Sequence, residues 1–479
     1  MESIKLVNPY DEVLYPGHPF AQCHPDRLSV MARLFGMDPA PIEHCRVLEL
    51  GCADGGNLIP MAYTLRDSEF VGLDRGARGV AAGRQMIEAL GLVNARIECR
   101  DILASVEGLG KFDYILAHGV YSWVPPAVQQ RMLAICSECL NPHGVAYISY
   151  AAYPGAHVRA MIGEMLRYHA RRFPSPQDQI EQARVLLTFL SAARPSQDVY
   201  SMLLRREVET LSTRRPESLY HDELAEFQTP VYFRDFVANA SRHRLQYLGE
   251  ADFFEMLDSS ESPEVVSMLH KLAADPIDKE QFLDFLKCRR FRQTLLCRAE
   301  LPLERRLQSG QMRQFFIGAG CNRQPEKTPS DHPVAKAAMA ALIDAWPAVL
   351  SFDELLDRVH TTDSELLSDM ILGFFACGLF QLHTHRPQFA VTVSERPRAS
   401  ALARLQARTQ SHVTNLCHGA VHMNDDISRH LLAVLDGTRD RAAILDHLRP
   451  FAAAENAPTL ERDLEPSLQG LAKLALLES

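Results

Sequence analysis

The stretch CRVLELGCADGGNLIP, residues 45–60, decides the fold. Its apolar segment RVLEL predicts a buried strand, and the segment GNLIPMAYTL that begins at Gly56 predicts a helix. An acid, Glu49, stands near the end of the strand, and a glycine-rich turn joins the two elements. Such a turn lets a ligand approach the backbone and directs the N–H groups of the helix towards it. The junction therefore predicts a ligand site at the carboxyl end of the strand.

Strands and helices continue to alternate after this junction. We expect strands at residues 69–74, 95–101 and 112–119 and from 145 onward, and helices at 79–91 and 126–144. Alternation at this spacing implies right-handed crossovers and a parallel, doubly wound α/β sheet of the Rossmann-like kind. Two later stretches, 245–253 and 291–301, also have strand character, and we expect them to complete the sheet at its edge. Residues from about 160 to 220 are amphipathic and helical, which predicts an insertion over one end of the sheet.

Composition limits the classes of protein that fit. The chain has 479 residues, 47% of them hydrophobic, which is enough for two or three domains with packed cores. Its net charge is −10, and its basic patches at 167–173 and 287–292 are short, so we expect no nucleic-acid partner. The sequence shows no signal peptide and no apolar run long enough to span a membrane.

Eleven cysteines are scattered singly through the chain. The one CxxC pair, Cys136 and Cys139, has no second pair to complete a zinc site, so we expect no bound metal. Unpaired cysteines are typical of a reducing compartment, and we expect a cytoplasmic protein.

The residues of the turn discriminate between two kinds of ligand. Gly51, Gly55 and Gly56 do not follow the GxGxxG spacing of dinucleotide sites, and no Lys-Ser or Lys-Thr pair follows to make a P-loop. Glu49 precedes the first glycine and would repel a phosphate, whereas it would attract a cationic amine. S-adenosylmethionine carries an ammonium and a sulfonium and no phosphate, so it is the predicted ligand.

Two further acids follow the next two strands. Asp74 ends the second strand, where its carboxylate can accept hydrogen bonds from both ribose hydroxyls. Asp101 ends the third, where it can accept from the adenine amino group while Ile102 covers the ring face. The carboxyl ends of parallel strands meet at one crevice, so the three acids together predict one site.

The fourth and fifth strands lead into aromatic segments. The sequence AHGVYSWVPP, residues 117–126, places His118, Tyr121 and Trp123 beside the expected position of the methyl group. Aromatic faces can hold an amine or line a narrow channel. The alternative is that Tyr121 and Trp123 only pack beneath the helix that begins at Pro126. Tyr150 and Tyr153 follow the fifth strand on the same rim.

Several long strings resemble a known family. They are YDEVLYPGHPFAQCHPDRLSVMARLFGM (10–37), LELGCADGGNLIPMA (48–62), HGVYSWVP (118–125), YAAYPGAH (150–157), PVYFRDFVANASRHRLQYLGEADF (230–253) and LDGTRDRAAIL (435–445). Together they resemble bacterial class I methyltransferases with a methyltransferase regulatory domain, a group that includes the rickettsial protein lysine methyltransferases. The resemblance covers nearly the whole chain.

The resemblance implies a division of the chain and a set of site residues. The expected domains are a methyltransferase core at 1–160, a helical and regulatory domain at 161–320, and a C-terminal winged-helix-like domain at 331–479 after a linker at 321–333. The residues implied to bind S-adenosylmethionine are Tyr15, Glu49, Gly51, Gly55, Asn57, Asp74, Asp101, Ile102 and His118. The residues expected to meet the acceptor are Phe20, His24, Trp123, Tyr150 and Tyr153. The N-terminal segment that carries Tyr10, Tyr15, Phe20 and His24 is implied to fold over the cofactor.

One loop departs from the family. The family sequence Tyr-Asn-Thr-Tyr-Pro-Gly-Trp reads YAAYPGA at 150–156, so the amide and the indole ring are missing. If those groups touch the acceptor, this chain takes a different acceptor or has a weakened activity.

Three functions follow from these observations. The main hypothesis is an N-methyltransferase that acts on protein lysine, with Tyr121 aligning the acceptor and His118 or Tyr121 receiving its proton. The second is a methyltransferase for a small molecule or modified peptide, a reading that Ala151 and Ala152 keep open. The third is a cofactor-binding scaffold without turnover. A homodimer is compatible with each of them.

Overall fold

The computed structural model describes residues 8–193, 197–258, 261–320, 330–451 and 459–479. Most of the predicted linker, residues 321–329, lies outside this part of the chain, as do residues 1–7 at the start where no signal peptide was expected.

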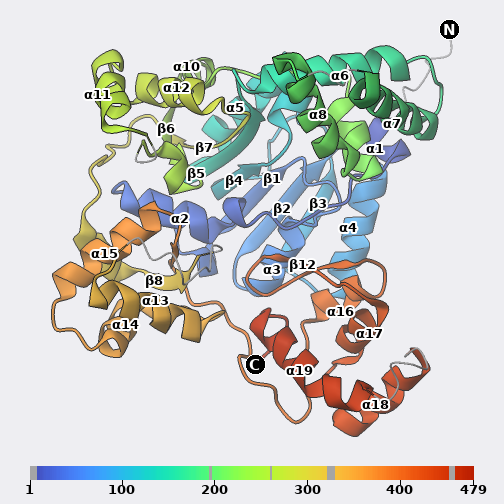
Figure 1. Ribbon diagram of the computed structural model, residues 1–479, viewed down its shortest axis with the longest axis vertical. Helices are drawn as coiled ribbons and strands as arrows, with labels where there is room; N and C mark the ends of the chain where they lie inside the picture. Colours follow the sequence, from blue (N-terminus) through green and yellow to red (C-terminus); the bar gives the residue numbers. More distant parts are fainter. Residues whose placement is uncertain (1–7, 194–196, 259–260, 321–329, 452–458) are drawn as a thin grey trace.

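A seven-stranded sheet forms the centre of the molecule, with the strand order β3-β2-β1-β4-β5-β7-β6 (Figure 1). Its strands are β1 (Arg46–Leu50), β2 (Glu69–Asp74), β3 (Ala95–Cys99), β4 (Phe112–Ala117), β5 (Leu140–Ala151), β6 (Leu245–Glu250) and β7 (Phe291–Arg298). The first five strands are parallel, whereas β7 runs antiparallel to both β5 and β6. The predicted doubly wound sheet and its completion by two late strands are therefore confirmed.

Helices cover both faces of this sheet. They are α2 (Pro25–Leu34), α3 (Leu58–Thr64), α4 (Ala77–Ala89), α5 (Pro126–Cys139), α10 (Phe233–Arg242), α11 (Pro263–Leu272) and α12 (Pro276–Lys287). Alternate residues of β1 enter opposite cores: Val47 packs in the cluster that holds α2 and α3, and Leu48 packs in the cluster that holds α5 and α10. Glu49, next in the alternation, is thereby directed to the α3 side.

The structure differs from the sequence prediction at two kinds of boundary. The helix expected to reach Gly144 ends at Cys139, and β5 begins at Leu140. Pro142 explains this difference because proline lacks the N–H that a helix would require there. The third and fourth strands end two residues earlier than expected, at Cys99 and Ala117.

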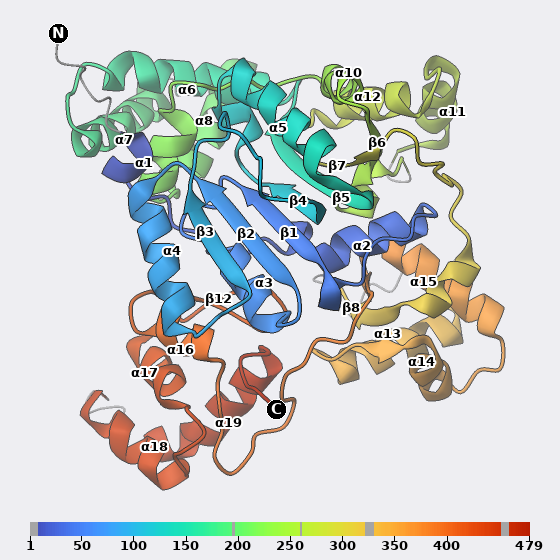
Figure 2. The same ribbon diagram turned by 180° about the vertical axis from the view of Figure 1, so that it is seen from behind.

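The expected helical insertion is present. It consists of α6 (Ala156–Ala170), α7 (Pro176–Ala193) and α8 (Val199–Ser212), followed by the short helices α9 (Pro216–Ser218) and η4 (Leu219–Glu223). These helices share a small core of their own that includes Leu166, Leu187 and Leu204. Figure 2 shows β1, β2 and β3 ending on the side of the molecule where α1 (Pro9–Glu12) and the insertion lie. The insertion thus stands over the carboxyl ends of the strands.

Two further units follow in the C-terminal third. The first contains α13 (Pro333–Ala345), β9 (Leu350–Ser351), α14 (Phe352–Val359), α15 (Ser364–Ala376) and β10 (Phe380–His383). Its sheet has the order β10-β8-β9 and takes β8 (Phe316–Ala319) from the segment that the sequence assigned to the preceding domain.

The second unit contains α16 (Ala401–Ala407), β11 (His412–Thr414), β12 (Ala420–His422), α17 (Asp426–Val434), α18 (Arg441–Leu448) and α19 (Leu460–Lys473). It packs around a core that includes Leu432, Ile444 and Leu468. Figure 1 shows the first unit, in orange, beside α2, and the second, in red, beneath α3 and α4.

The described helices and cysteines bear on membrane insertion and on disulfide bonding. None of their helices has both the length and the apolar character that crossing a membrane requires. All ten of the described cysteines are free thiols.

Candidate active site

The site is built on the turn between β1 and α3. Gly51 and Gly55 have φ values of 72° and 76°, a backbone region that side chains other than glycine rarely adopt. The N–H of Gly51 donates to the carbonyl of Leu73 at 2.8 Å, which fastens the turn to the end of β2. A Cβ on Gly51 would lie 2.5 Å from Cγ2 of Val120 in the segment after β4. The glycines therefore allow three chain segments to meet closely at the ends of β1, β2 and β4.

Glu49 lies beneath this turn and is 4% exposed. Its Oε1 accepts a hydrogen bond of 2.8 Å from Nδ2 of Asn57, whereas its Oε2 is buried and has no hydrogen-bond partner in the described part of the chain. Burial, together with the nearby charges of Asp74 and Asp54, raises the pKa of Glu49 to about 7 against the opposing effect of the hydrogen bond from Asn57. A buried carboxylate oxygen without a partner fits a cationic amine.

Asp74 and Asp101 differ in their surroundings. Asp74 accepts hydrogen bonds from the N–H groups of Ala53 at 2.9 Å and Gly76 at 2.7 Å. Burial raises its pKa, and these two backbone N–H groups oppose that rise. Asp101 is exposed and caps its own loop by accepting from the N–H of Leu103 at 2.8 Å. Each carboxylate keeps lone pairs for a ligand, and Ile102 packs partly buried beside the sheet.

The N-terminal strap, which we define as residues 8–24, lies over the turn. The N–H of Phe20 donates to Oδ1 of Asn57 at 2.9 Å. Gly17 packs closely against Asp54 and Gly56. A Cβ on Gly17 would lie 2.0 Å from Oδ1 of Asp54 and 2.7 Å from the backbone nitrogen of Gly56. The strap thus lies against the turn between β1 and α3, and its contact with the cofactor stays a prediction.

His118 follows β4 and faces the strap. Its ring stacks on Phe20 with centroids 3.8 Å apart, and its Nδ1 lies 2.8 Å from the hydroxyl of Tyr147. Burial lowers the pKa of His118 to about 4, so the imidazole is neutral near pH 7. The segment after β4 therefore presents a neutral ring to the strap rather than a charge.

Tyr121 and Tyr150 are both buried in the core on the α5 and α10 side of the sheet, and their contacts with the acceptor stay a prediction. Tyr121 is 1% exposed, packs edge-on against Phe236, and accepts a hydrogen bond from Nδ2 of Asn239 at 3.3 Å. Tyr150 is fully buried and stacks on the same Phe236 with centroids 4.2 Å apart. Both rings belong to the core on the α5 and α10 side of the sheet, whereas Glu49 lies on the other side. These contacts favour the packing alternative for Tyr121.

His24 and Tyr153 also have other partners. Nδ1 of His24 accepts the N–H of Asp26 at 3.2 Å and so caps the N-terminus of α2. Burial lowers the pKa of His24 to about 3. Tyr153 stacks on His157 of α6 with centroids 4.0 Å apart. These contacts give both residues structural partners, and their predicted contact with the acceptor stays a prediction.

Trp123 lies under the helical insertion. Its Nε1 donates to the carbonyl of Asp222 at 3.4 Å, and the guanidinium of Arg159 lies 5.9 Å from the ring centroid. His221, the residue before Asp222, stacks on Tyr10 with centroids 4.5 Å apart and meets Tyr15 edge-on at 5.7 Å. Tyr10 in turn lies beside Gly76, next to Asp74. An aromatic and acidic cluster, Tyr10, Tyr15, Trp123 and Asp222, therefore adjoins the end of β2.

One contact at this site could not be predicted from the sequence. His418, in the loop between β11 and β12, is 4% exposed and places its Nε2 2.9 Å from Oδ1 of Asn57. No motif marks a single histidine that lies 361 positions along the chain from its partner. Only the docking of the last unit against α3 brings the two together.

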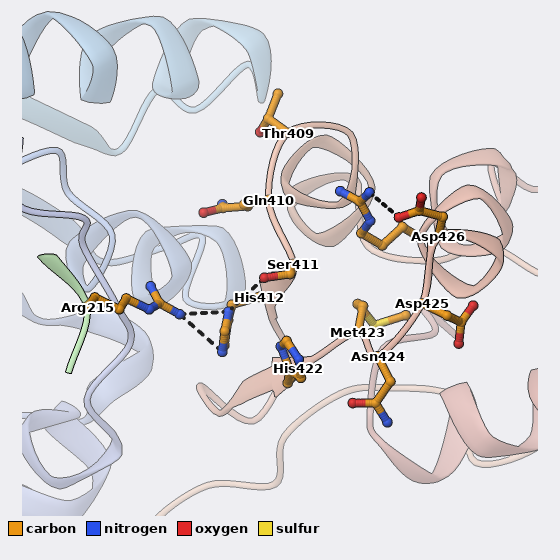
Figure 3. A pocket seen from close by; sticks show the side chains of 11 residues that line it. Arg215, Thr409, Gln410, Ser411, His412, His422, Met423, Asn424, Asp425 and Asp426 are labelled. Carbon is orange, nitrogen blue, oxygen red and sulfur yellow. Dashed lines mark hydrogen bonds and ion pairs between the residues drawn. The ribbon is translucent and has the colours of Figure 1, made fainter. Parts of the chain in front are cut away.

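A pocket of about 630 Å³ lies apart from these residues, between the insertion and the last unit (Figure 3). Arg215 reaches into it and contacts both ring nitrogens of His412, and His422 and Asp425 also line it. None of the predicted site residues lines this pocket. In the described ranges, no group of three His, Cys, Asp or Glu side chains could hold a metal ion.

Three family descriptions match segments of this chain. Residues 48–146 match a "Methyltransferase domain", residues 215–298 a "Predicted methyltransferase regulatory domain", and residues 395–475 a "PKMT, C-terminal winged helix domain". The fold and these matches define a methyltransferase with a regulatory domain and a winged-helix domain.

Individual relatives show which family of methyltransferases the chain belongs to. The protein RP789 of Rickettsia prowazekii is 32% identical, over 92% of this chain and 85% of its own length. RP028 of the same organism is 35% identical over half of this chain. The chain belongs to the family of RP789.

Solved structures agree with this assignment. The structure of PKMT2 from Rickettsia typhi has a TM-score of 0.85 and 26% identity, and it covers 97% of this chain and 99% of its own. The structure of the same protein in complex with AdoHcy has a TM-score of 0.86, 25% identity and the same coverage. The family resemblance, the α/β fold and the C-terminal winged helix predicted from the sequence are thereby confirmed.

Proposed function

We propose that this chain transfers a methyl group from S-adenosylmethionine to lysine side chains of a protein. The observation that carries the cofactor assignment is the buried Oε2 of Glu49, which lacks a partner beneath a glycine-rich turn. An ammonium group satisfies such an oxygen, and a phosphate does not. The complex of PKMT2 with AdoHcy, the demethylated form of this methyl donor, supports the assignment.

The cofactor residues divide by the part of the ligand that they meet. Glu49 holds the ammonium, and the backbone of Gly51 and Gly55 cradles the amino-acid part. Asp74 accepts from the ribose hydroxyls, while Asp101 and Ile102 meet the adenine. Asn57 orients Glu49, and the stacked rings of Phe20 and His118 cover the site. The close contacts of Gly51 and Gly17 leave no room for larger residues in this arrangement.

The aromatic and acidic cluster receives the acceptor amine. Trp123 and Tyr15 offer ring faces that can hold an amine. The carboxylate of Asp222 is already paired with Arg214 at 2.8 Å and with Arg159 at 3.4 Å, so the aromatic faces carry this proposal. Burial raises the pKa of Asp222 against the opposing effect of Arg159 and Arg214, so the cluster lies in a poorly hydrated region. This cluster takes over the role that the sequence had assigned to Tyr121.

The chain's contribution to the reaction is alignment and exclusion of water. When bound, S-adenosylmethionine supplies an electrophilic methyl group. A lysine with an unperturbed pKa of about 10.4 must lose its proton before it attacks, and a poorly hydrated aromatic site lowers that pKa. Holding the neutral amine in line with the methyl group accounts for most of the expected acceleration.

The choice of a protein acceptor rests on the family. Residues 395–475 match the PKMT winged-helix description, and PKMT2 covers almost the whole chain. A small-molecule acceptor is the second candidate, because Ala151 and Ala152 put no polar side chain where the family has Asn and Thr.

Transfer of labelled methyl groups tests both candidates. The purified chain is incubated with methyl-labelled S-adenosylmethionine and a bacterial lysate, and the protein fraction is hydrolysed and analysed for methyllysine. We expect label in methyllysine, and an Asp74→Ala variant as the control should lose it. Label confined to the small-molecule fraction would support the second candidate. Cofactor binding without any transfer would indicate a scaffold.

We also propose a cellular location, a class of partner and an oligomeric state for this protein. The free cysteines support a cytoplasmic location, which fractionation with an epitope tag would test. The net charge of −10 supports a partner other than nucleic acid, and filter binding with duplex and single-stranded probes would test this. A homodimer remains a prediction that light scattering can check.

A further inference from the structure

His418 enters the cofactor region from the C-terminal unit. Its backbone has φ 57°, a left-handed conformation that costs free energy in a residue other than glycine. The loop that imposes it is tightly held: Oδ1 of Asn415 accepts from the N–H of Gly419 at 2.7 Å, and Nδ2 of Asn415 donates to the carbonyl of Leu474 at 2.9 Å. The loop thus presents His418 from a fixed platform at the end of α19.

The hydrogen bonds of Asn57 determine which way its amide faces. Oδ1 receives the backbone N–H of Phe20 at 2.9 Å and Nε2 of His418 at 2.9 Å. A backbone N–H is always a donor, so the atom opposite Phe20 must be the amide oxygen. His418 must then donate from Nε2, which is the neutral tautomer protonated at that nitrogen. Burial also favours the neutral form by lowering the pKa of His418.

The other end of the amide acts on Glu49. With Oδ1 held by two donors, Nδ2 faces Glu49 and donates to its Oε1 at 2.8 Å. That bond fixes the orientation of the Glu49 carboxylate, and the other oxygen, Oε2, has no hydrogen-bond partner among the described residues. A chain of hydrogen bonds thus runs from the winged-helix unit through Asn57 to the carboxylate that the proposed function assigns to the ammonium.

We infer that His418 is a positioning residue for cofactor binding, and that the C-terminal winged-helix unit completes the cofactor site instead of acting only as a docking module. The inference rests on the proposed function, since it concerns the same site. Its direct consequence is that the winged-helix unit and the cofactor stabilise each other, because each favours the same orientation of Asn57.

Two variants, His418→Gln and His418→Met, have side chains of similar length and together isolate the hydrogen bond that His418 donates to Asn57. Gln at position 418 can place an N–H near Oδ1 of Asn57, whereas Met has similar length and no donor. His360→Met is the matched control, because His360 also has a left-handed backbone, with φ 55°, but is exposed at the C-cap of α14. Calorimetric titration with S-adenosylhomocysteine gives the dissociation constant for each full-length variant. Thermal unfolding without ligand reports their stability separately.

We expect His418→Met to weaken binding about tenfold or more, His418→Gln to remain within about threefold of the wild type, and His360→Met to bind as the wild type does. In an Asn57→Ala background, His418→Met should cause no further loss. Equal affinities for the Gln and Met variants would overturn the inference, whether both bind normally or both bind weakly. A wild-type chain that fails to bind would instead overturn the proposed function itself.

Discussion

Phe20 stacks on His118 with ring centroids 3.8 Å apart, and the same Phe20 donates its backbone N–H to Asn57. One residue of the N-terminal strap is therefore fastened both to the helix after the glycine-rich turn and to the segment after β4. We expect a ligand held between these segments to enter and leave past Phe20. The strap is expected to govern how fast the cofactor dissociates.

Gly17→Ala should lift the strap. The added methyl group would lie 2.0 Å from Oδ1 of Asp54 and 2.7 Å from the backbone nitrogen of Gly56, so the segment has to move. We expect S-adenosylhomocysteine to bind about tenfold more weakly, mainly through faster dissociation, as stopped-flow measurements would show. Gly310→Ala is the control because no atom lies within 4 Å of its new methyl group. An unchanged dissociation rate in Gly17→Ala would contradict the role of the strap.

Cofactor affinity should depend on pH through Glu49. Burial raises the pKa of this carboxyl to about 7 in the free protein, and a cationic ammonium binds only its ionised form. The free carboxyl takes up a proton as pH falls below 7, so the dissociation constant should rise by about tenfold between pH 8 and pH 6. Glu49→Gln should bind weakly at both values and lose most of this dependence. A steep dependence that persists in Glu49→Gln would assign it to another group.

Tyr121→Phe should leave methyl transfer nearly unchanged. The hydroxyl of Tyr121 bonds to Asn239 in the core, away from Glu49, so its loss removes one partly buried hydrogen bond. We expect a destabilisation of about 1 kcal/mol and a turnover within about twofold of the wild type. Trp123→Leu, in the cluster proposed to receive the acceptor, should instead reduce turnover at least tenfold with little change in cofactor affinity. A large loss of turnover in Tyr121→Phe would restore the role inferred from the sequence.

Arg292→Met should destabilise the regulatory segment. The side chain is fully buried, and its guanidinium pairs with Glu250 at 2.6 Å, Asp284 at 2.8 Å and Glu280 at 3.0 Å. Its removal leaves three carboxylates buried near one another, at a cost of about 3–5 kcal/mol. Thermal unfolding should therefore begin at a clearly lower temperature. Arg449→Met, which breaks an exposed pair with Asp446, should cost no more than about 1 kcal/mol.

The central fold could be predicted from the sequence because its signals are local. The run RVLEL and the glycines after it predict a strand, a turn and a helix within a few residues. The same holds for Glu49 and Asp74, whose places at strand ends follow from the pattern. The exact ends of the strands could not be predicted from the pattern. The third strand, for example, ends at Cys99, two residues before the predicted end at Asp101.

The acceptor side could not be predicted in the same way. Tyr121 and Trp123 are two positions apart and within the same short helix, η3 (Tyr121–Trp123), yet one enters the core beside Phe236 and the other meets Asp222. Which ring faces which side depends on α10 and the insertion, which are contributed by residues about a hundred positions later. His418 depends on an even more distant unit. Contacts between remote segments carry no periodic signal in the sequence.

Calorimetric titration of the full-length protein with S-adenosylhomocysteine at pH 8 tests the central claim most directly. Our account predicts saturable binding at one site per chain, and it predicts that Asp74→Ala weakens this binding sharply because the ribose hydroxyls lose their acceptor. Absence of saturable binding by the folded wild-type protein, or unchanged binding by Asp74→Ala, would contradict the assignment of the cofactor to the turn between β1 and α3.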